Sequence, residues 1–301
     1  MPVPEGLDGE RADLALAKLL GFSRTMAQTV LASGDARMDG RTLGKSDRVL
    51  AGAFLEVNWS DPEPVRVVET PVDGLDIVYL DEDIVVVDKP VGVVAHPATS
   101  WHGPTVLGAL AARGISVSAF GPPERQGIVQ RLDVGTSGLM VVARSDRAYS
   151  NLKRAFKERT VHKIYHALVQ GQLDPLDGTI DAPIGRAPQH EWKFAVRADG
   201  RHAVTHYETM EAFRYASLAR IHLETGRTHQ IRVHMSSVRH PLAGDILYGA
   251  DPTLARRLGL DRQWLHAVSL SFEHPGSGEW VEFRSEYPRD LAQALDTLAH
   301  L

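Results

Sequence analysis

The sequence of 301 residues contains no cysteine, which excludes disulfides, thiolate nucleophiles and cysteine-ligated zinc. It has no run of about 18 apolar residues, so we expect no membrane-spanning helix. Its first residues, MPVPEGLDGERAD, are polar and acidic, unlike a secretory signal. We therefore expect a cytoplasmic protein that does not associate with membranes, and the length predicts two unequal domains.

Signatures of metal and nucleotide binding are also missing. There is no HExxH sequence and no phosphate loop of the form GxxxxGK[ST]. Of the 14 histidines, His229 and His234 lie five residues apart, and no closely spaced set of carboxylates accompanies them. We expect no metal site.

Positive charge is scarce overall, because the formal net charge is −5. This balance disfavours nucleic acid as a partner, since proteins that bind it usually carry a basic surface. The charge is unevenly distributed, however. Between Glu124 and Lys163 there are nine Lys and Arg residues against four Asp and Glu residues. Binding of RNA therefore remains open as a local property of the chain.

The first 60 residues predict a compact unit of two helices packed on a small sheet. The expected elements are a helix over 10–20 ended by Gly21, a second helix over 24–33 capped by Ser23, two strands around an Asp39-Gly40 turn, and a strand over 51–59. Residues 61–74 are rich in proline and predict an extended linker.

Residues 75–301 contain many apolar strand-like segments and few helices, which predicts an α+β domain on a largely antiparallel sheet. We expect strands over 128–132 and 139–144, with Asp133 on the turn between them. A helix is expected to begin at Gly226 or Thr228. Taken alone, Asp133 before Gly-Thr-Ser-Gly is most often a turn former. Similarly, Arg232 alone would be a surface charge.

Several motifs together resemble the RluA/RluD family of pseudouridine synthases, in the same order. They are DKPVGVVAHP, RLDVGTSGLMVVA, KIYHALVQG, TGRTHQIRVHM and HPLAGDILYG. The N-terminal unit, with FSRTMAQTVLASGDARMDGRTL and AGAFLEVNW, is similar to the S4 RNA-binding domain. The resemblance implies a mixed-sheet pseudouridine synthase domain over 75–301, an S4-like domain over 1–60, and no cofactor. It also implies structured RNA as the partner, with large-subunit ribosomal RNA favoured. A monomer is our default.

The resemblance assigns roles to particular residues. Asp133 matches the family's catalytic aspartate, which acts as nucleophile, and Tyr165 matches the active-site tyrosine. Arg232 matches the arginine that pairs with the aspartate. Arg131 matches a residue implicated in base flipping. Apart from the resemblance, His229 is a neighbour of Arg232 at i, i+3 on the expected helix, and we expect it to bind substrate. In the S4-like unit the candidate phosphate contacts are Arg24, Arg37, Arg41, Lys45 and Arg48.

Two other functions remain open at this point. The chain could be a noncatalytic RNA-binding protein, which would not need an ionised carboxylate in an RNA cleft. It could also be a glycosidase, which would need a second carboxylate about 5–10 Å from Asp133. The group that removes the C5 proton of the uracil is likewise open between Tyr165 and solvent.

Overall fold

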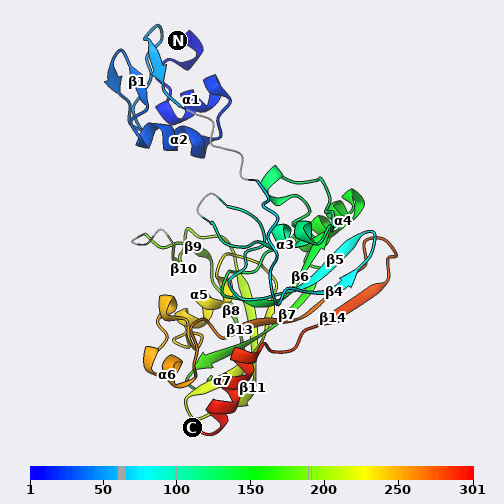
Figure 1. The fold of residues 1–301 in the computed structure, drawn as a ribbon. Coiled ribbons are helices and arrows are strands. Elements are labelled where there is room, and N and C mark those ends of the chain that lie inside the picture. The colour runs from blue at the N-terminus through cyan, green and yellow to red at the C-terminus, as the bar shows by residue number, and fades with distance from the viewer. Residues whose placement is uncertain (60–65, 99–100, 189, 191) are drawn as a thin grey trace. The chain divides into compact units, whose positions relative to one another are not determined.

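The computed structural model describes residues 1–59, 66–98, 101–188, 190 and 192–301. The chain divides into two compact units, Met1–Pro64 and Val65–Leu301 (Figure 1). Of the expected linker, residues 61–65 lie outside the described part. The segment that follows packs on the larger unit, because the Thr70 amide donates to the Gly108 carbonyl at 3.2 Å.

The smaller unit is an antiparallel three-stranded sheet, in the order β2-β1-β3, with two α-helices. Its elements are η1 (Glu5–Leu7), α1 (Ala12–Leu20), α2 (Arg24–Ala32), β1 (Ala36–Met38), β2 (Arg41–Thr42) and β3 (Leu55–Val57). The Ser23 hydroxyl accepts a hydrogen bond from the Met26 amide, which confirms the predicted helix cap. Asp39 and Gly40 both have positive φ, as a two-residue hairpin turn requires.

The larger unit is built on one nine-stranded sheet (Figure 1). Its strands are β4 (Asp76–Leu80), β5 (Ile84–Lys89), β6 (Ser137–Ala143), β7 (His162–Gln170), β8 (Asp177–Asp181), β11 (Val204–Ala212), β12 (Ala216–Leu223), β13 (Leu265–Glu273) and β14 (Trp280–Arg284). The order is β4-β5-β6-β13-β7-β12-β11-β8, with β14 on β13. Only β13 and β6 pair in parallel among these described strands. The predicted α+β fold with a largely antiparallel sheet is therefore confirmed.

Helices cover this sheet, and a small hairpin lies beside it. The remaining elements are α3 (Val106–Ala112), η2 (Pro123–Arg125), α4 (Asp146–Glu158), β9 (Ile184–Arg186), β10 (Phe194–Val196), α5 (Gln230–Ser237), η3 (Ile246–Tyr248), α6 (Pro252–Arg257) and α7 (Arg289–Ala299). Alternate residues of β5 enter different cores, because a strand points successive side chains to opposite faces. Val85 and Val87 pack with Leu110 of α3, whereas Val86 packs with Leu152 of α4.

Two expected elements differ from the structure. The strand expected over 128–132 is reduced to one bridge between Ile128 and Val142, so the chain reaches Asp133 as an irregular segment. The helix expected from Gly226 or Thr228 begins at Gln230, after His229 adopts a left-handed conformation with φ 55°. A residue with positive φ cannot continue a right-handed helix, so it fixes the first turn.

Candidate active site

Asp133 lies on a tight turn that leads into β6. The Thr136 amide donates to the Asp133 carbonyl at 3.0 Å, which closes the turn. Gly138 then has φ 113°, and a Cβ atom there would lie 2.4 Å from the Ala267 carbonyl oxygen of β13. Only glycine fits this position. The glycine of the predicted turn thus serves the close parallel pairing of β6 with β13.

A neighbouring loop and a buried arginine hold this turn in place. The Gly92 amide donates to the Val134 carbonyl at 2.8 Å, and the Arg262 guanidinium donates to the Gly135 carbonyl at 3.1 Å. Lys89 is fully buried and donates to the Pro90 and Val93 carbonyls at 2.9 and 2.8 Å. Burial lowers the pKa of Lys89 to about 7, although the Asp133 charge opposes this shift. The DKPVGVV segment therefore supports the turn that carries Asp133.

The five predicted site residues of the larger unit line one cavity. They are Arg131, Asp133, Tyr165, His229 and Arg232. The Asp133 carboxylate is 17% exposed, and its Oδ2 lies 3.7 Å from Arg232 Nη1 and 3.9 Å from His229 Nε2. Residues separated by about a hundred positions in the sequence thus surround one carboxylate. Among the described residues that line the cavity, Asp133 is the only acidic one.

The strongest partner of Arg232 is a residue that the sequence analysis did not select. Arg232 Nε and Nη2 donate to Asp245 Oδ2 and Oδ1 at 2.7 and 2.8 Å, a bidentate pair. The Tyr248 ring lies 4.8 Å from the guanidinium carbon. Asp245 and Tyr248 belong to HPLAGDILYG, a motif quoted only for its resemblance. The expected pair of Arg232 with Asp133 is therefore the longer of two contacts, and Asp245 orients the guanidinium.

Tyr248 connects His229 to strand β10 through hydrogen bonds. The Phe194 amide donates to the Tyr248 hydroxyl at 3.0 Å, and that hydroxyl lies 2.8 Å from His229 Nδ1. Burial raises the pKa of Tyr248, so its hydroxyl stays protonated and can either donate to Nδ1 or accept from it. Burial also lowers the pKa of His229. The lowered pKa keeps the ring neutral at pH 7, and its Nε2 atom lies 3.9 Å from Asp133 Oδ2.

Tyr165 is a buried phenol on β7, and its neighbours are Ile221 of β12 and Ala267 of β13. Burial raises the pKa of Tyr165 well above its usual value, and the Asp133 charge raises it further. Without substrate, this hydroxyl is consequently a hydrogen-bond donor and not an anionic base.

The cavity is too small for a nucleotide as it stands. Its volume is about 70 Å³, whereas sites for small molecules usually measure about 300–1,000 Å³. Arg131 donates to the Thr228 hydroxyl at 3.0 Å, which links two segments of the cavity wall. The Arg131 side chain is exposed, so it is the part of this wall that is simplest to displace.

The predicted RNA contacts of the smaller unit divide into two groups. Arg24 forms an ion pair with the buried Asp13 at 3.3 Å, Arg41 pairs with Asp47 at 3.4 Å, and Arg48 donates to the Gly9 carbonyl. Arg37 and Lys45 form no ion pair with any residue that the structure describes. The first group is at least partly committed to the fold. Arg48 keeps its charge because a carbonyl does not neutralise it, and Arg37 and Lys45 have no ion-pair partner among the described residues.

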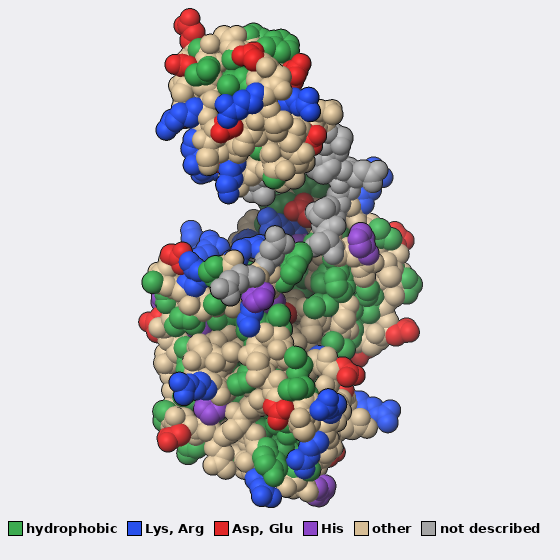
Figure 2. Space-filling view, turned by 90° about the vertical axis from the view of Figure 1, so that its left-hand side faces the viewer, with side chains coloured by type: hydrophobic (Ala, Val, Ile, Leu, Met, Phe, Trp, Pro, Cys, Tyr) green, Lys and Arg blue, Asp and Glu red, His purple; other side chains and the backbone are tan. Residues whose placement is uncertain are grey.

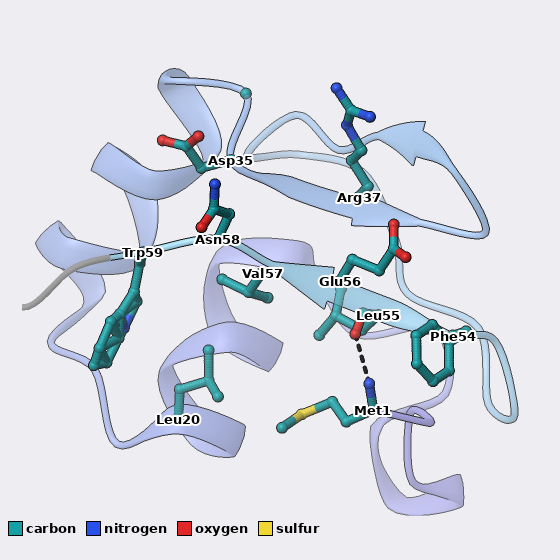
Figure 3. Close-up of a pocket in the computed structure, with 11 residues that line it drawn as sticks. Met1, Leu20, Asp35, Arg37, Phe54, Leu55, Glu56, Val57, Asn58 and Trp59 are labelled. Atoms are coloured by element: carbon teal, nitrogen blue, oxygen red, sulfur yellow. Dashed lines mark hydrogen bonds between the residues drawn. The ribbon is translucent and has the colours of Figure 1, made fainter.

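Arg37 borders an open cavity of about 780 Å³ on the smaller unit (Figure 3). It lies opposite Glu56 in the β1–β3 register. Trp59, which packs against Phe22 with ring centroids 4.8 Å apart, lines another part of the cavity. The charges of Asp35 and Glu56 offset that of Arg37, so the cavity lacks the positive potential that phosphates favour.

No helix within the described ranges is long and apolar enough to cross a bilayer. Over the same ranges, no three His, Asp or Glu side chains are grouped as metal ligands would be.

Comparison with known proteins identifies the family. Residues 83–237 match the family model for RNA pseudouridylate synthase. An uncharacterized RNA pseudouridine synthase of Mycobacterium bovis is 59% identical over 299 residues, covering 99% of this chain and 97% of that protein. Ribosomal large subunit pseudouridine synthase D of Xanthomonas campestris is 40% identical, covering 98% and 91%.

Solved structures agree with the sequence comparison. Human RNA Pseudouridylate Synthase Domain Containing 1 superposes with a TM-score of 0.58 and 29% identity, covering 72% of this chain and 84% of that one. The matched family model spans the Asp133 turn, Tyr165 and Arg232 alike. The chain is therefore an RNA pseudouridine synthase, and it belongs to the RNA pseudouridylate synthase family.

Proposed function

We propose that the chain isomerises uridines of large-subunit ribosomal RNA, with Asp133 as the nucleophile that acts on an extruded base. The observation that carries the proposal is one carboxylate in a small cavity, within 4 Å of both Arg232 and His229 and beside Tyr165. Relatives named ribosomal large subunit pseudouridine synthase D support the choice of RNA.

The reaction breaks the N1–C1′ bond of uridine, turns the base and joins C5 to C1′. A carboxylate can assist as a nucleophile when it is ionised and correctly placed. The Arg232 guanidinium places a permanent positive charge next to Asp133, and Asp245 keeps that guanidinium in position. Because Arg232 is bound in a bidentate pair, it can face the Asp133 carboxylate without losing its orientation.

Extrusion of the base gives Arg131 and Tyr165 their proposed roles. A stacked uridine hides its reacting atoms, so enzymes that act on bases unstack them at a cost of a few kcal/mol. Arg131 lines the cavity and is exposed, so its guanidinium can leave Thr228 and fill the gap in the RNA. Tyr165 forms an apolar wall on which the uracil can stack. As a neutral phenol it is a poor first acceptor for the C5 proton, which favours solvent in that step.

A glycosidase would need a second carboxylate that can donate a proton. Asp245, the other carboxylate that contacts Arg232, is the candidate for this proton donor. Both its oxygens, however, accept hydrogen bonds from the Arg232 guanidinium. It is buried and does not line the cavity. The geometry therefore favours isomerisation.

The proposed RNA target can be tested in cells. We expect pseudouridine mapping to show one or more sites in large-subunit ribosomal RNA that disappear when the gene is deleted. The wild-type gene should restore those sites, and the Asp133→Asn gene should not. A deletion strain that retains every ribosomal pseudouridine would contradict the proposed substrate, and loss of sites in transfer RNA alone would redirect it.

A further inference from the structure

A second hollow adjoins the active-site cavity. It has a volume of about 470 Å³ and is formed by the approach to Asp133, the end of α4, strand β7 and the segment after β12. We call it the flanking groove. It shares five lining residues with the active-site cavity, namely Arg131, Tyr165, Leu223, Gly226 and Arg227. A polymeric ligand such as RNA that places one nucleotide in the cavity can therefore place the adjacent nucleotide in the groove.

The flanking groove is strongly basic, although the whole chain is acidic. Five cationic side chains line it, namely Arg131, Lys157, Arg159, Lys163 and Arg227. Glu224, the one carboxylate among its described lining residues, already binds Arg159 at 3.0 Å and His206 at 2.8 Å. Acidic and basic side chains are interspersed over the face shown in Figure 2.

Among the cations that line the groove, Lys163 lies nearest to Tyr165 in the sequence. It lies on β7 two residues before Tyr165, so both side chains point to the same face of the sheet, about 6.6 Å apart along the strand. Its ammonium lies 5.9 Å from the centre of the Phe156 ring and forms no ion pair with a described residue. Burial lowers the pKa of Lys163 to about 8. A partly buried cation without a carboxylate is costly for the fold, and a bound anion would offset that cost.

We propose that the flanking groove binds the RNA backbone beside the target uridine, and that Lys163 contacts the phosphodiester of an adjacent nucleotide. This inference rests on the proposed function, because the target base must occupy the cavity next to Tyr165. The ligand is a phosphodiester linkage, which a compact ammonium recognises as a point charge. Arg227 and Lys157 extend the same positive surface along the groove.

A structural role explains some of these cations but not Lys163. Lys157 and Arg159 lie at the carboxyl end of α4, where basic residues stabilise the helix dipole. Lys163 is on a strand, where no helix dipole applies, and its ammonium makes only a distant cation–π contact with Phe156 at 5.9 Å. Replacement of Lys163 therefore separates phosphate binding from support of the fold.

The test compares Lys163→Met, which keeps the unbranched apolar stem, with Lys163→Arg, which keeps the charge. The matched control is Lys153→Met on the exposed surface of α4, outside the groove. The substrate is an unmodified transcript of large-subunit ribosomal RNA. We expect Lys163→Met to raise KM about five- to tenfold with kcat unchanged within twofold. It should also reduce the slope of log affinity against log salt by about 0.7–0.9, as loss of one phosphate contact requires.

Lys163→Arg should restore both KM and the salt slope, and Lys153→Met should match the wild type.

A second measurement alters the RNA, so it remains informative even where a variant fails to fold. In an oligonucleotide that contains the target uridine, one neutral methylphosphonate linkage beside that uridine should weaken wild-type binding but not weaken Lys163→Met further. The inference would be overturned if Lys163→Met had the KM and salt slope of the wild type. It would also be overturned if the wild type bound RNA with a neutral linkage as tightly as unaltered RNA. Either result would leave the proposed function intact. Absence of pseudouridine formation by the wild-type protein would instead overturn the proposed function.

Discussion

Arg232 faces two carboxylates that differ in what they can do. Asp245 takes both ends of the guanidinium fork, and Asp133 receives only a longer contact at 3.7 Å. Asp133 therefore stays available to a substrate, while Asp245 determines where the positive charge lies. At the scale of single residues, the site depends on this division between a carboxylate that reacts and one that positions.

Asp245→Asn tests that division. The change leaves the buried Arg232 with a weaker partner, so we expect the free energy of unfolding to fall by about 3 kcal/mol. Misplacement of the guanidinium by about 1 Å should lower kcat roughly a hundredfold with a smaller change in KM. The matched control is Asp251→Asn, at the exposed cap of α6, where asparagine caps equally well. Unchanged kcat and stability in Asp245→Asn would show that Arg232 needs no second carboxylate.

The residues of the site could be selected from sequence only through the motifs. Read alone, Asp133 is a turn aspartate, and Arg232 is a charge on a short helix. Asp245 could not be paired with Arg232 from sequence, because the contact depends on how the loop between them returns to α5. An acidic residue inside the apolar stretch of HPLAGDILYG was the one available signal.

At the scale of elements, the turn before β6 combines strand pairing with catalysis. Gly138 allows β6 to approach β13. The Gly92 amide and the Arg262 guanidinium bind the backbone of the turn, and Lys89 binds the Val93 carbonyl next to Gly92. The sequence predicted this turn because glycine and hydroxyl residues mark turns locally. It overpredicted the strand over 128–132, since apolar composition there reflects burial of Ile128, Val129 and Leu132 in cores and not a hydrogen-bonded ladder.

Gly138→Ala tests the role of close approach. Its Cβ atom would meet Ala267 backbone at 2.4 Å with φ at 113°, so we expect a loss of at least about 2 kcal/mol in unfolding free energy. Gly114→Ala is the matched control, because Gly114 also has positive φ but open space around its Cβ. That control should lose only about 1 kcal/mol. Equal losses in denaturant titrations of the two variants would mean that the β6–β13 contact adds no constraint.

At the scale of the whole molecule, positive charge is local. The flanking groove is basic, whereas in the smaller unit Arg24 pairs with Asp13 and Arg41 pairs with Asp47. The charged residues can be counted from the sequence, but their ion pairs cannot be predicted from it, since Arg24 and Asp13 lie on different helices. The predicted linker over 61–74 shows the same limit. Proline content indicated an extended segment, but contacts such as Thr70 with Gly108 depend on tertiary structure.

Arg37 and Lys45 are the cations through which we expect the smaller unit to contribute to RNA binding. Combined replacement, Arg37→Gln with Lys45→Gln, should weaken RNA affinity three- to tenfold and reduce the salt slope by about 1.4–1.8. At saturating RNA, kcat should not change, because these residues lie outside the active-site cavity. The control is Lys18→Gln, whose ammonium pairs with Glu10. Affinity and salt slope equal to those of the wild type would exclude this surface as an RNA contact.

The most direct test of the account is pseudouridine formation by purified Asp133→Asn protein. Asparagine keeps the size of the side chain and removes its charge, so the variant should fold and melt like the wild type and bind RNA within a fewfold. We predict that its rate of pseudouridine formation on a large-subunit ribosomal RNA transcript falls by at least about 10³-fold. Modification at the wild-type rate by well-folded Asp133→Asn protein would contradict the assignment of Asp133 as the nucleophile.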